Sequence, residues 1–159
     1  MSLQDNPIVR RIDGFFKKID LKYDLREDHD VFVFGHSVES KLSNVRFFVH
    51  ARQSDFWARA VSPISGDTQD PQMMASLAEL ICRINYSLVE GRFIMDFNDG
   101  ELGYQVTVDT SGVEEPTDEM IAVSIFLPIK MWEKYSSAFL AVIFGGKSAE
   151  EALELVNDD

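Results

Sequence analysis

The sequence is poor in cysteine and histidine. It has one cysteine, Cys82, and three histidines among 159 residues. A single cysteine excludes an intramolecular disulfide and is typical of a reducing compartment. His36 and His50 fall in strand-like runs, but no nearby Cys, Asp or Glu has the spacing of metal ligands. We therefore expect surface or hydrogen-bonded histidines, no metal site and no cofactor.

Basic residues are also scarce, with 15 Lys and Arg against 27 Asp and Glu and a net charge of −12. Phosphate binding needs clustered Lys and Arg, and anionic membrane surfaces repel an acidic protein, so we expect neither a nucleic acid nor a membrane partner. The apolar runs Ile121–Ile129 and Ala138–Phe144 fall well short of the roughly 20 residues that span a bilayer. No secretory signal is visible at the N-terminus. A cytoplasmic protein is expected.

Catalytic motifs are missing as well. The glycines of a nucleophile elbow are absent, and Gly145-Gly146 lacks the strand and the spaced glycines of a phosphate loop. The stretch Asp96–Glu101 suggests a calcium loop, but Thr107 stands where an EF-hand needs glutamate. Turn chemistry explains the Asn98-Asp99-Gly100 sequence fully. We expect no enzymatic activity and name no catalytic residue.

What the chain has is regular apolar periodicity, with 45% hydrophobic residues. Its length suits one domain over residues 1–159. The predicted elements are a helix over Pro7–Asp20, strands over Val31–Ser37, Val45–Ala51 and Asp55–Ser62, a helix from Pro71 with an apolar stripe reaching Leu88, a hairpin over Phe93–Asp109, a helix over Thr117–Phe144 and a short helix after Ser148. Short links between the strands imply antiparallel pairing. The order predicts an α+β fold with a mainly antiparallel sheet of about five strands, α-βββ-α-ββ-α-α.

Prolines weaken two parts of this prediction. Pro63–Gly66 should break the sheet after the third strand, and Pro128 should kink or split the long C-terminal helix. Ile121, Val123 and Ile125 alternate, so a strand is an alternative for the first part of that helix.

Several motifs resemble the YbjN-domain family. They are Arg83-Ile84-Asn85-Tyr86, Glu90-Gly91-Arg92-Phe93, Asp96, Asp99-Gly100-Glu101-Leu102-Gly103-Tyr104, Tyr135, Val142-Ile143-Phe144-Gly145-Gly146 and Glu150-Glu151-Ala152-Leu153. The resemblance implies a non-enzymatic α+β domain of the type III secretion chaperone-like fold, often dimeric, with regulatory or chaperone-like roles. It supplies no catalytic residue.

One face of the predicted sheet combines aromatic or apolar side chains with arginine. If the strands register as expected, this face carries Arg46, Phe48, Trp57, Arg59, Arg92 and Ile94. Aromatic residues and arginine are enriched in protein interfaces, so these six residues are our candidate protein-binding site. The alternative is that the chain's own helices cover this face.

The Thr117–Phe144 helix is apolar on nearly all sides, so nearly all of it must be buried. We expect a homodimer with Met131, Trp132, Phe139 and Ile143 at its interface. Full burial inside the monomer is the competing interpretation.

Together these features favour a homodimeric protein-interaction module with a chaperone-like or regulatory role and a protein partner. The alternative function is a sensor that binds a small molecule or a metal ion between sheet and helices.

Overall fold

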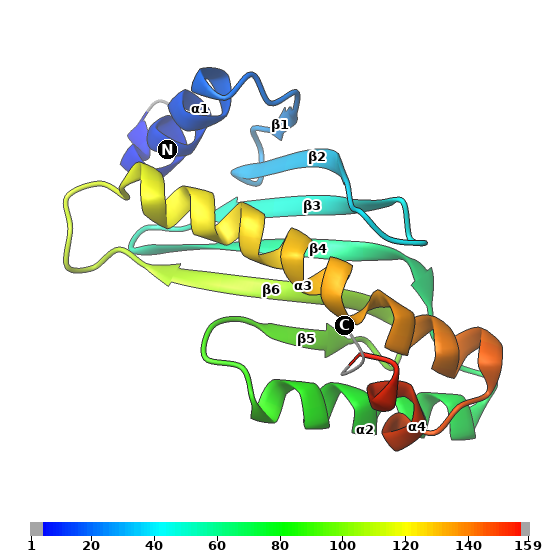
Figure 1. Cartoon of the computed structure of the whole chain (residues 1–159). Helices are drawn as coiled ribbons and strands as arrows, with labels where there is room; N and C mark the ends of the chain where they lie inside the picture. The colour runs from blue at the N-terminus through cyan, green and yellow to red at the C-terminus, as the bar shows by residue number, and fades with distance from the viewer. Residues whose placement is uncertain (1–4, 157–159) are drawn as a thin grey trace.

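The computed structural model describes residues 5–156 (Figure 1). Its elements are α1 (Pro7–Lys18), β1 (Asp24–Arg26), β2 (Val31–Ser37), β3 (Asn44–Ala51), β4 (Asp55–Ser65), α2 (Pro71–Tyr86), β5 (Arg92–Met95), β6 (Glu101–Asp109), α3 (Asp118–Gly145) and α4 (Ala149–Glu154). The six strands form one antiparallel sheet in the order β1-β2-β3-β4-β6-β5. Helices α1 and α3 lie on one face of the sheet, and α2 with α4 lies beyond its β5 edge (Figure 1).

The prediction of an α+β fold with an antiparallel sheet is confirmed, but the prediction of five strands is wrong. The additional strand is β1, whose residues Asp24, Leu25 and Arg26 pair with Val33, Phe32 and Val31. Three residues are too few for an alternating pattern to be recognised, so β1 has no signal in the sequence.

The sheet also continues further through Pro63 than the sequence indicates. Strand β4 runs to Ser65, and its pairing with β6 resumes at Ser65↔Glu101 after an irregular stretch that begins past Val61. Pro63 falls inside this irregular stretch, where a missing N–H removes no regular ladder bond. The proline therefore disturbs the register without ending the strand.

Helix α3 is continuous over 28 residues with Pro128 inside it. Pro128 does not split it, and the strand alternative for Ile121–Ile125 is wrong. Ile121 and Ile125 are buried against the sheet whereas Val123 between them is 43% exposed. That pattern has the period of a helix and not of a strand.

The helix ends follow the signals in the sequence. The side chain of Asn6 accepts from the Ile8 N–H at 3.0 Å, and Asp70 accepts from the Met73 N–H at 3.0 Å. Ser148 and Glu151 form a reciprocal capping box, each bond 3.2 Å long. The prediction that proline follows each N-cap of α1 and α2 is confirmed.

One carboxylate joins α1 to the start of α3. Asp118 accepts from Arg11 Nη2 at 2.6 Å and from Lys18 Nζ at 2.8 Å. The hydrogen bonds from Lys18 and Arg11 lower the pKa of Asp118 below its ordinary value of 3.8. A group with a lowered folded-state pKa stabilises the fold above its unfolded pKa, and that stabilisation is lost as the pH falls through the folded value.

We therefore expect acid to destabilise the fold partly by protonating Asp118. From about pH 5 to about pH 2, the thermal midpoint of the wild type should fall more steeply than that of Asp118→Asn, which has no carboxylate to protonate there. Circular dichroism melts across this range measure the difference. Parallel slopes would show that the ion pairs add nothing to stability, as is common for exposed pairs.

Among the helices of residues 5–156, none has the length and apolar character needed to traverse a bilayer.

Candidate protein-binding site

Helices α1 and α3 cover only one of the two faces of the sheet (Figure 1). On the face under α1 and α3, Val45, Phe47, Val49, Ala58 and Ala60 are all buried. The alternate residues of the same strands point to the other face and are exposed or only half-buried. We call this second surface the open face. The alternative that the chain's helices cover it does not fit these exposures.

All six residues of the predicted protein-binding site lie on the open face. Strand register sets Phe48 opposite Arg59, Arg59 opposite Gln105, and Gln105 opposite Arg92, which gives one row across four strands. The other three residues of the predicted site, Arg46, Trp57 and Ile94, lie on neighbouring rows of the same face. The structure thus brings the six together on one surface.

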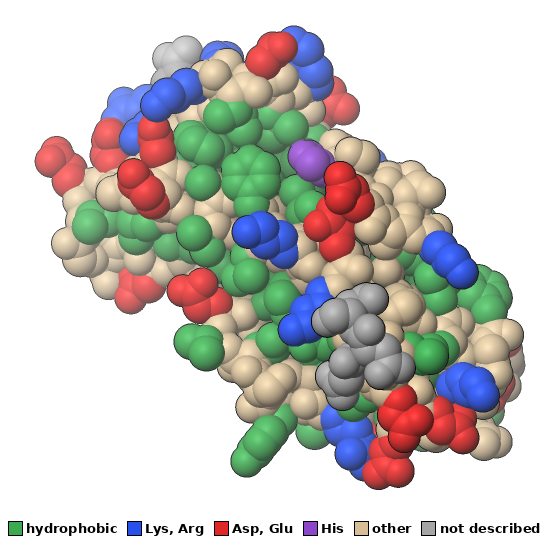
Figure 2. Space-filling view, in the orientation of Figure 1, with side chains coloured by type: hydrophobic (Ala, Val, Ile, Leu, Met, Phe, Trp, Pro, Cys, Tyr) green, Lys and Arg blue, Asp and Glu red, His purple; other side chains and the backbone are tan. Residues whose placement is uncertain are grey.

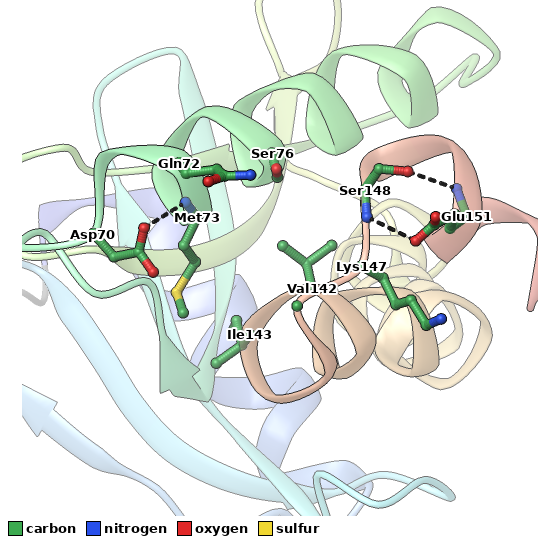
Figure 3. Close-up of a pocket in the computed structure, with 10 residues that line it drawn as sticks. Asp70, Gln72, Met73, Ser76, Val142, Ile143, Lys147, Ser148 and Glu151 are labelled. Atoms are coloured by element: carbon green, nitrogen blue, oxygen red, sulfur yellow. Dashed lines mark hydrogen bonds between the residues drawn. The ribbon is translucent and has the colours of Figure 1, made fainter.

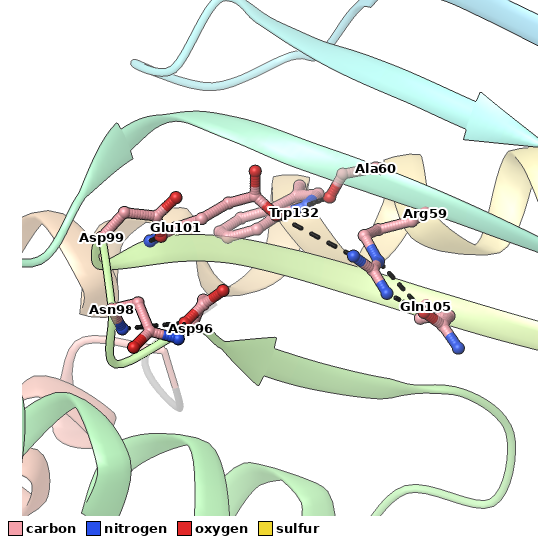
Figure 4. A network of polar contacts seen from close by, with 8 residues as sticks. All are labelled: Arg59, Ala60, Asp96, Asn98, Asp99, Glu101, Gln105 and Trp132. Carbon is pink, nitrogen blue, oxygen red and sulfur yellow. Dashed lines mark hydrogen bonds and ion pairs between the residues drawn. The ribbon is translucent and has the colours of Figure 1, made fainter.

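Arg59 lies at the centre of a polar network (Figure 4). Its Nε and Nη2 both donate to Gln105 Oε1, at 3.0 and 2.8 Å. Its Nη1 lies 3.9 Å from Glu101 Oε1, and its guanidinium carbon lies 5.0 Å from the centre of the Trp57 ring. These contacts hold the guanidinium next to an aromatic ring that it attracts through the ring quadrupole.

A glycine makes this position possible. A Cβ on Gly103 would lie 3.3 Å from Arg59 Cγ and 3.4 Å from Ile94 Cγ1. Because Gly103 has no side chain, the aliphatic stem of Arg59 can lie against the strand beside it. In the sequence Gly103 stands out only as part of a family motif and Gln105 not at all, because their roles here depend on the β4–β6 register.

Two more aromatic contacts extend the cluster along β3. The Arg46 guanidinium lies 5.5 Å from the Phe48 ring centre. His50 and Trp57 are register partners, and their rings meet edge to face at 5.3 Å. His50 thus has an aromatic contact on the sheet, and no group of three or more His, Cys, Asp or Glu within residues 5–156 could hold a metal ion.

The cluster lines a shallow hollow of about 320 Å³. Its lining residues are Arg26, His29, Val31, Phe48, Trp57, Arg59, Val61 and Glu101. Aromatic walls beside a fixed guanidinium can accept a side chain that is partly apolar and ends in a carboxylate. The arrangement has donors and apolar surface but no paired nucleophile and base.

The expected dimer residues of α3 do not form one surface. Trp132 and Phe139 have no exposed area and pack together at 5.1 Å, and Trp132 Nε1 donates to the Ala60 carbonyl at 2.9 Å. The interpretation that they contact a second chain is therefore corrected: they fill the core of one chain. Met131 and Ile143 are half-buried at its margin.

A separate hollow of about 460 Å³ lies between the start of α2, the end of α3 and α4 (Figure 3). Several of its polar groups already serve as helix caps, since Asp70 bonds to Met73 and Ser148 to Glu151. Its other polar side chains are Gln72, Ser76 and Lys147. The space between sheet and helices, where a sensor would hold its ligand, contains the packed rings of Phe93, Trp132 and Phe139.

The chain matches a protein-family model over most of its length. The model of the YbjN family, described as "Putative bacterial sensory transduction regulator", matches residues 9–141. The chain belongs to the YbjN family. The match covers every strand and most of α3, so the open face lies within it. The family's description is consistent with a regulatory role. No curated protein matches the chain.

Proposed function

We propose that this YbjN-family chain is a protein-interaction module without enzymatic activity, and that a protein partner docks on its open face. The observation that carries this proposal is the fixed arrangement of Arg59 against Trp57, Gln105 and Glu101 on a face that no described helix covers. Side chains already held in place lose little freedom on binding, which favours affinity.

The arginines of the open face offer donors to carboxylates of a partner segment. Four arginines point to this face: Arg26, Arg46, Arg59 and Arg92. The carboxylates Asp24, Asp55, Glu101 and Asp109 share the face, so the proposal rests on the local Arg46, Arg59 and Arg92 cluster and not on the charge of the whole face. Carboxylates of the partner would find bidentate donors there, beside rings that can pack against apolar side chains.

A pull-down from native lysate tests this function. We expect Trp57→Ala and Arg59→Ala each to reduce partner capture about tenfold or more, because buried aromatic and arginine anchors contribute most of the binding energy in such interfaces. Both side chains are half-exposed, so the melting temperature should change little.

Lys130→Ala is the matched control, because it removes an exposed cation from the helical side of the molecule. It should capture the partner as the wild type does. Equal capture by all four proteins would remove the open face from consideration.

Homodimerisation and a chaperone-like role belong to the same proposal. Phe144 is 73% exposed and Leu155 is 49% exposed, and both line a hollow with the half-buried Leu140, so apolar surface gathers where α3 ends. Other hydrophobic side chains show on the helical side among charged ones (Figure 2). The type III secretion chaperone-like fold implied by the resemblance supports pairing of two copies. Light scattering at micromolar concentration measures the mass. We propose a cytoplasmic location, supported by the single cysteine.

A further inference from the structure

One edge of the sheet is incomplete. Strand β5 pairs with β6 only from Arg92↔Gln105 to Met95↔Leu102, whereas β6 continues to Asp109. The last four residues of β6 pair with β4 on one side, and no strand of residues 5–156 pairs with them on the other. In Figure 1 the arrowhead of β6 extends past the start of β5.

The alternation of an antiparallel ladder shows which backbone groups face outward there. Thr110 donates its N–H to Ser54 on the β4 side, and the Glu101 carbonyl accepts from Asp96 on the β5 side. Odd-numbered residues of β6 therefore direct their N–H and C=O toward the β5 side. Beyond the end of β5 these residues are Thr107 and Asp109. Within residues 5–156 neither has a backbone partner on that side.

The chain protects the neighbouring edge but not this one. On β5, the outward N–H and C=O of Phe93 are bonded to the Asn85 side chain, each at 2.9 Å. The segment before β5 then turns away at Gly91, whose φ is +67°, and the Tyr104 hydroxyl donates to the Glu90 carbonyl at 2.5 Å. This turn leaves Thr107 uncovered.

A groove of about 560 Å³ runs beside this free edge, and we call it the edge groove. It is lined by Val89, Glu90, Gly91, Val106, Thr107, Val108, Asp109, Glu119, Met120 and Val123. Val89 is 99% exposed, so the groove presents apolar surface to solvent. An extended strand added beside Thr107 would send every second side chain into it.

The charge of the edge groove indicates what kind of segment would bind there. Glu90, Asp109 and Glu119 line it, and none of its lining residues is Lys or Arg. A segment in which basic residues alternate with apolar ones complements it. A second copy pairing through the same edge would instead bring these carboxylates together with their own images, which costs energy.

We propose that the free edge of β6 binds an extended segment of a partner protein in which apolar residues alternate with Lys or Arg. The segment continues the line of β5, bonds to the backbone of Thr107 and Asp109, and buries its apolar side chains in the edge groove. The edge groove shares no lining residue with the hollow of the Arg59 cluster, although the Thr107 side chain adjoins that cluster through Gln105 Nε2 at 3.4 Å, and the proposal goes beyond the proposed function. At the far edge of the sheet, where β2 extends past β1, the Ser37 carbonyl lies 2.7 Å from His36 Nδ1.

Fluorescence anisotropy with a labelled peptide of alternating Lys and Val, seven residues long and blocked at both ends, tests the proposal. Thr107→Pro removes the outward N–H but no bond to β4, as proline is tolerated at such edge positions. We expect it to weaken binding at least tenfold. Thr107→Val keeps the N–H and should bind like the wild type, as should Arg59→Ala. A peptide with Glu in place of Lys should bind at least tenfold more weakly.

Hydrogen exchange provides a second readout in the wild type, which is needed if Thr107→Pro fails to fold. The amides of Thr107 and Asp109 should exchange quickly in the free protein and become protected by the Lys-Val peptide. Absent binding, unchanged exchange at these amides, or equal affinity for the Glu-Val peptide would overturn the proposal. So would a dimer that Thr107→Pro converts to a monomer, because a second copy would then occupy the edge. Loss of binding in Arg59→Ala would assign the peptide to the open face instead.

Discussion

Replacing Trp132 with alanine is expected to lower the free energy of unfolding by about 3 to 5 kcal/mol. The indole has no exposed area and meets the Phe93 ring edge to face at 5.0 Å and the Phe139 ring at 5.1 Å. Its Nε1 also satisfies the Ala60 carbonyl of β4. Alanine would leave a cavity where α3 packs on the sheet, together with an acceptor that has lost its donor. Urea denaturation followed by circular dichroism measures the loss.

Two further variants separate the loss of buried ring volume from the loss of the hydrogen-bond donor and from the effect of an exposed ring. Trp132→Phe keeps most of the ring volume but not the donor, so its loss should be smaller, about 1 to 3 kcal/mol. Phe126→Ala removes a ring from the same helix at a position that is 44% exposed, and should cost less than about 1 kcal/mol. If Trp132→Ala cost as little as Phe126→Ala, the indole could not occupy the core as described.

The second large effect is expected at the turn between β5 and β6. Gly100 has a φ of +78°, and a Cβ there would lie 2.1 Å from the Gly66 carbonyl oxygen. The two glycines are joined by a 2.9 Å bond from the Gly66 N–H to the Gly100 carbonyl. Alanine at position 100 would therefore combine an unfavourable left-handed backbone conformation with a clash against main chain. We expect Gly100→Ala to cost about 2 to 4 kcal/mol in unfolding free energy, measured by urea denaturation.

Gly146 gives a matched control, because it has a φ of +61° but no atom lies within 4 Å of the place that a Cβ would take. Gly146→Ala should show the effect of the backbone conformation alone, about 1 kcal/mol. Similar losses in the two variants would mean that the close approach of Gly100 to Gly66 is relieved at no cost.

The sequence allowed the elements and the sheet faces to be predicted because both depend on local periodicity. In β3, Val45, Phe47 and Val49 alternate with Arg46 and Phe48, and the structure buries the first set only. Because side chains alternate along a strand, each one can be assigned to a face of the sheet without knowing which strand lies next to it. This is why all six candidate residues share the open face.

The sequence could not reveal features that depend on distant partners. A helix that is apolar on all sides looks the same whether a second chain or its own sheet covers it, and the Phe93 ring that packs against Trp132 lies 39 residues away in the chain. Gln105 and Gly103 join the Arg59 cluster only through register. The free edge at Thr107 depends on β5 being shorter than β6, which the composition of neither strand predicts.

The order of strands has a consequence for how the protein folds. Strands β1 to β4 are consecutive neighbours, and β5 with β6 is a hairpin, but the β4–β6 contact joins the two groups across the segment that contains α2. Local pairing closes short loops at low entropic cost, while this contact closes a much longer one. We expect the meander and the hairpin to form early as separate units. Their docking, with α3 laid across both, then sets the folding rate.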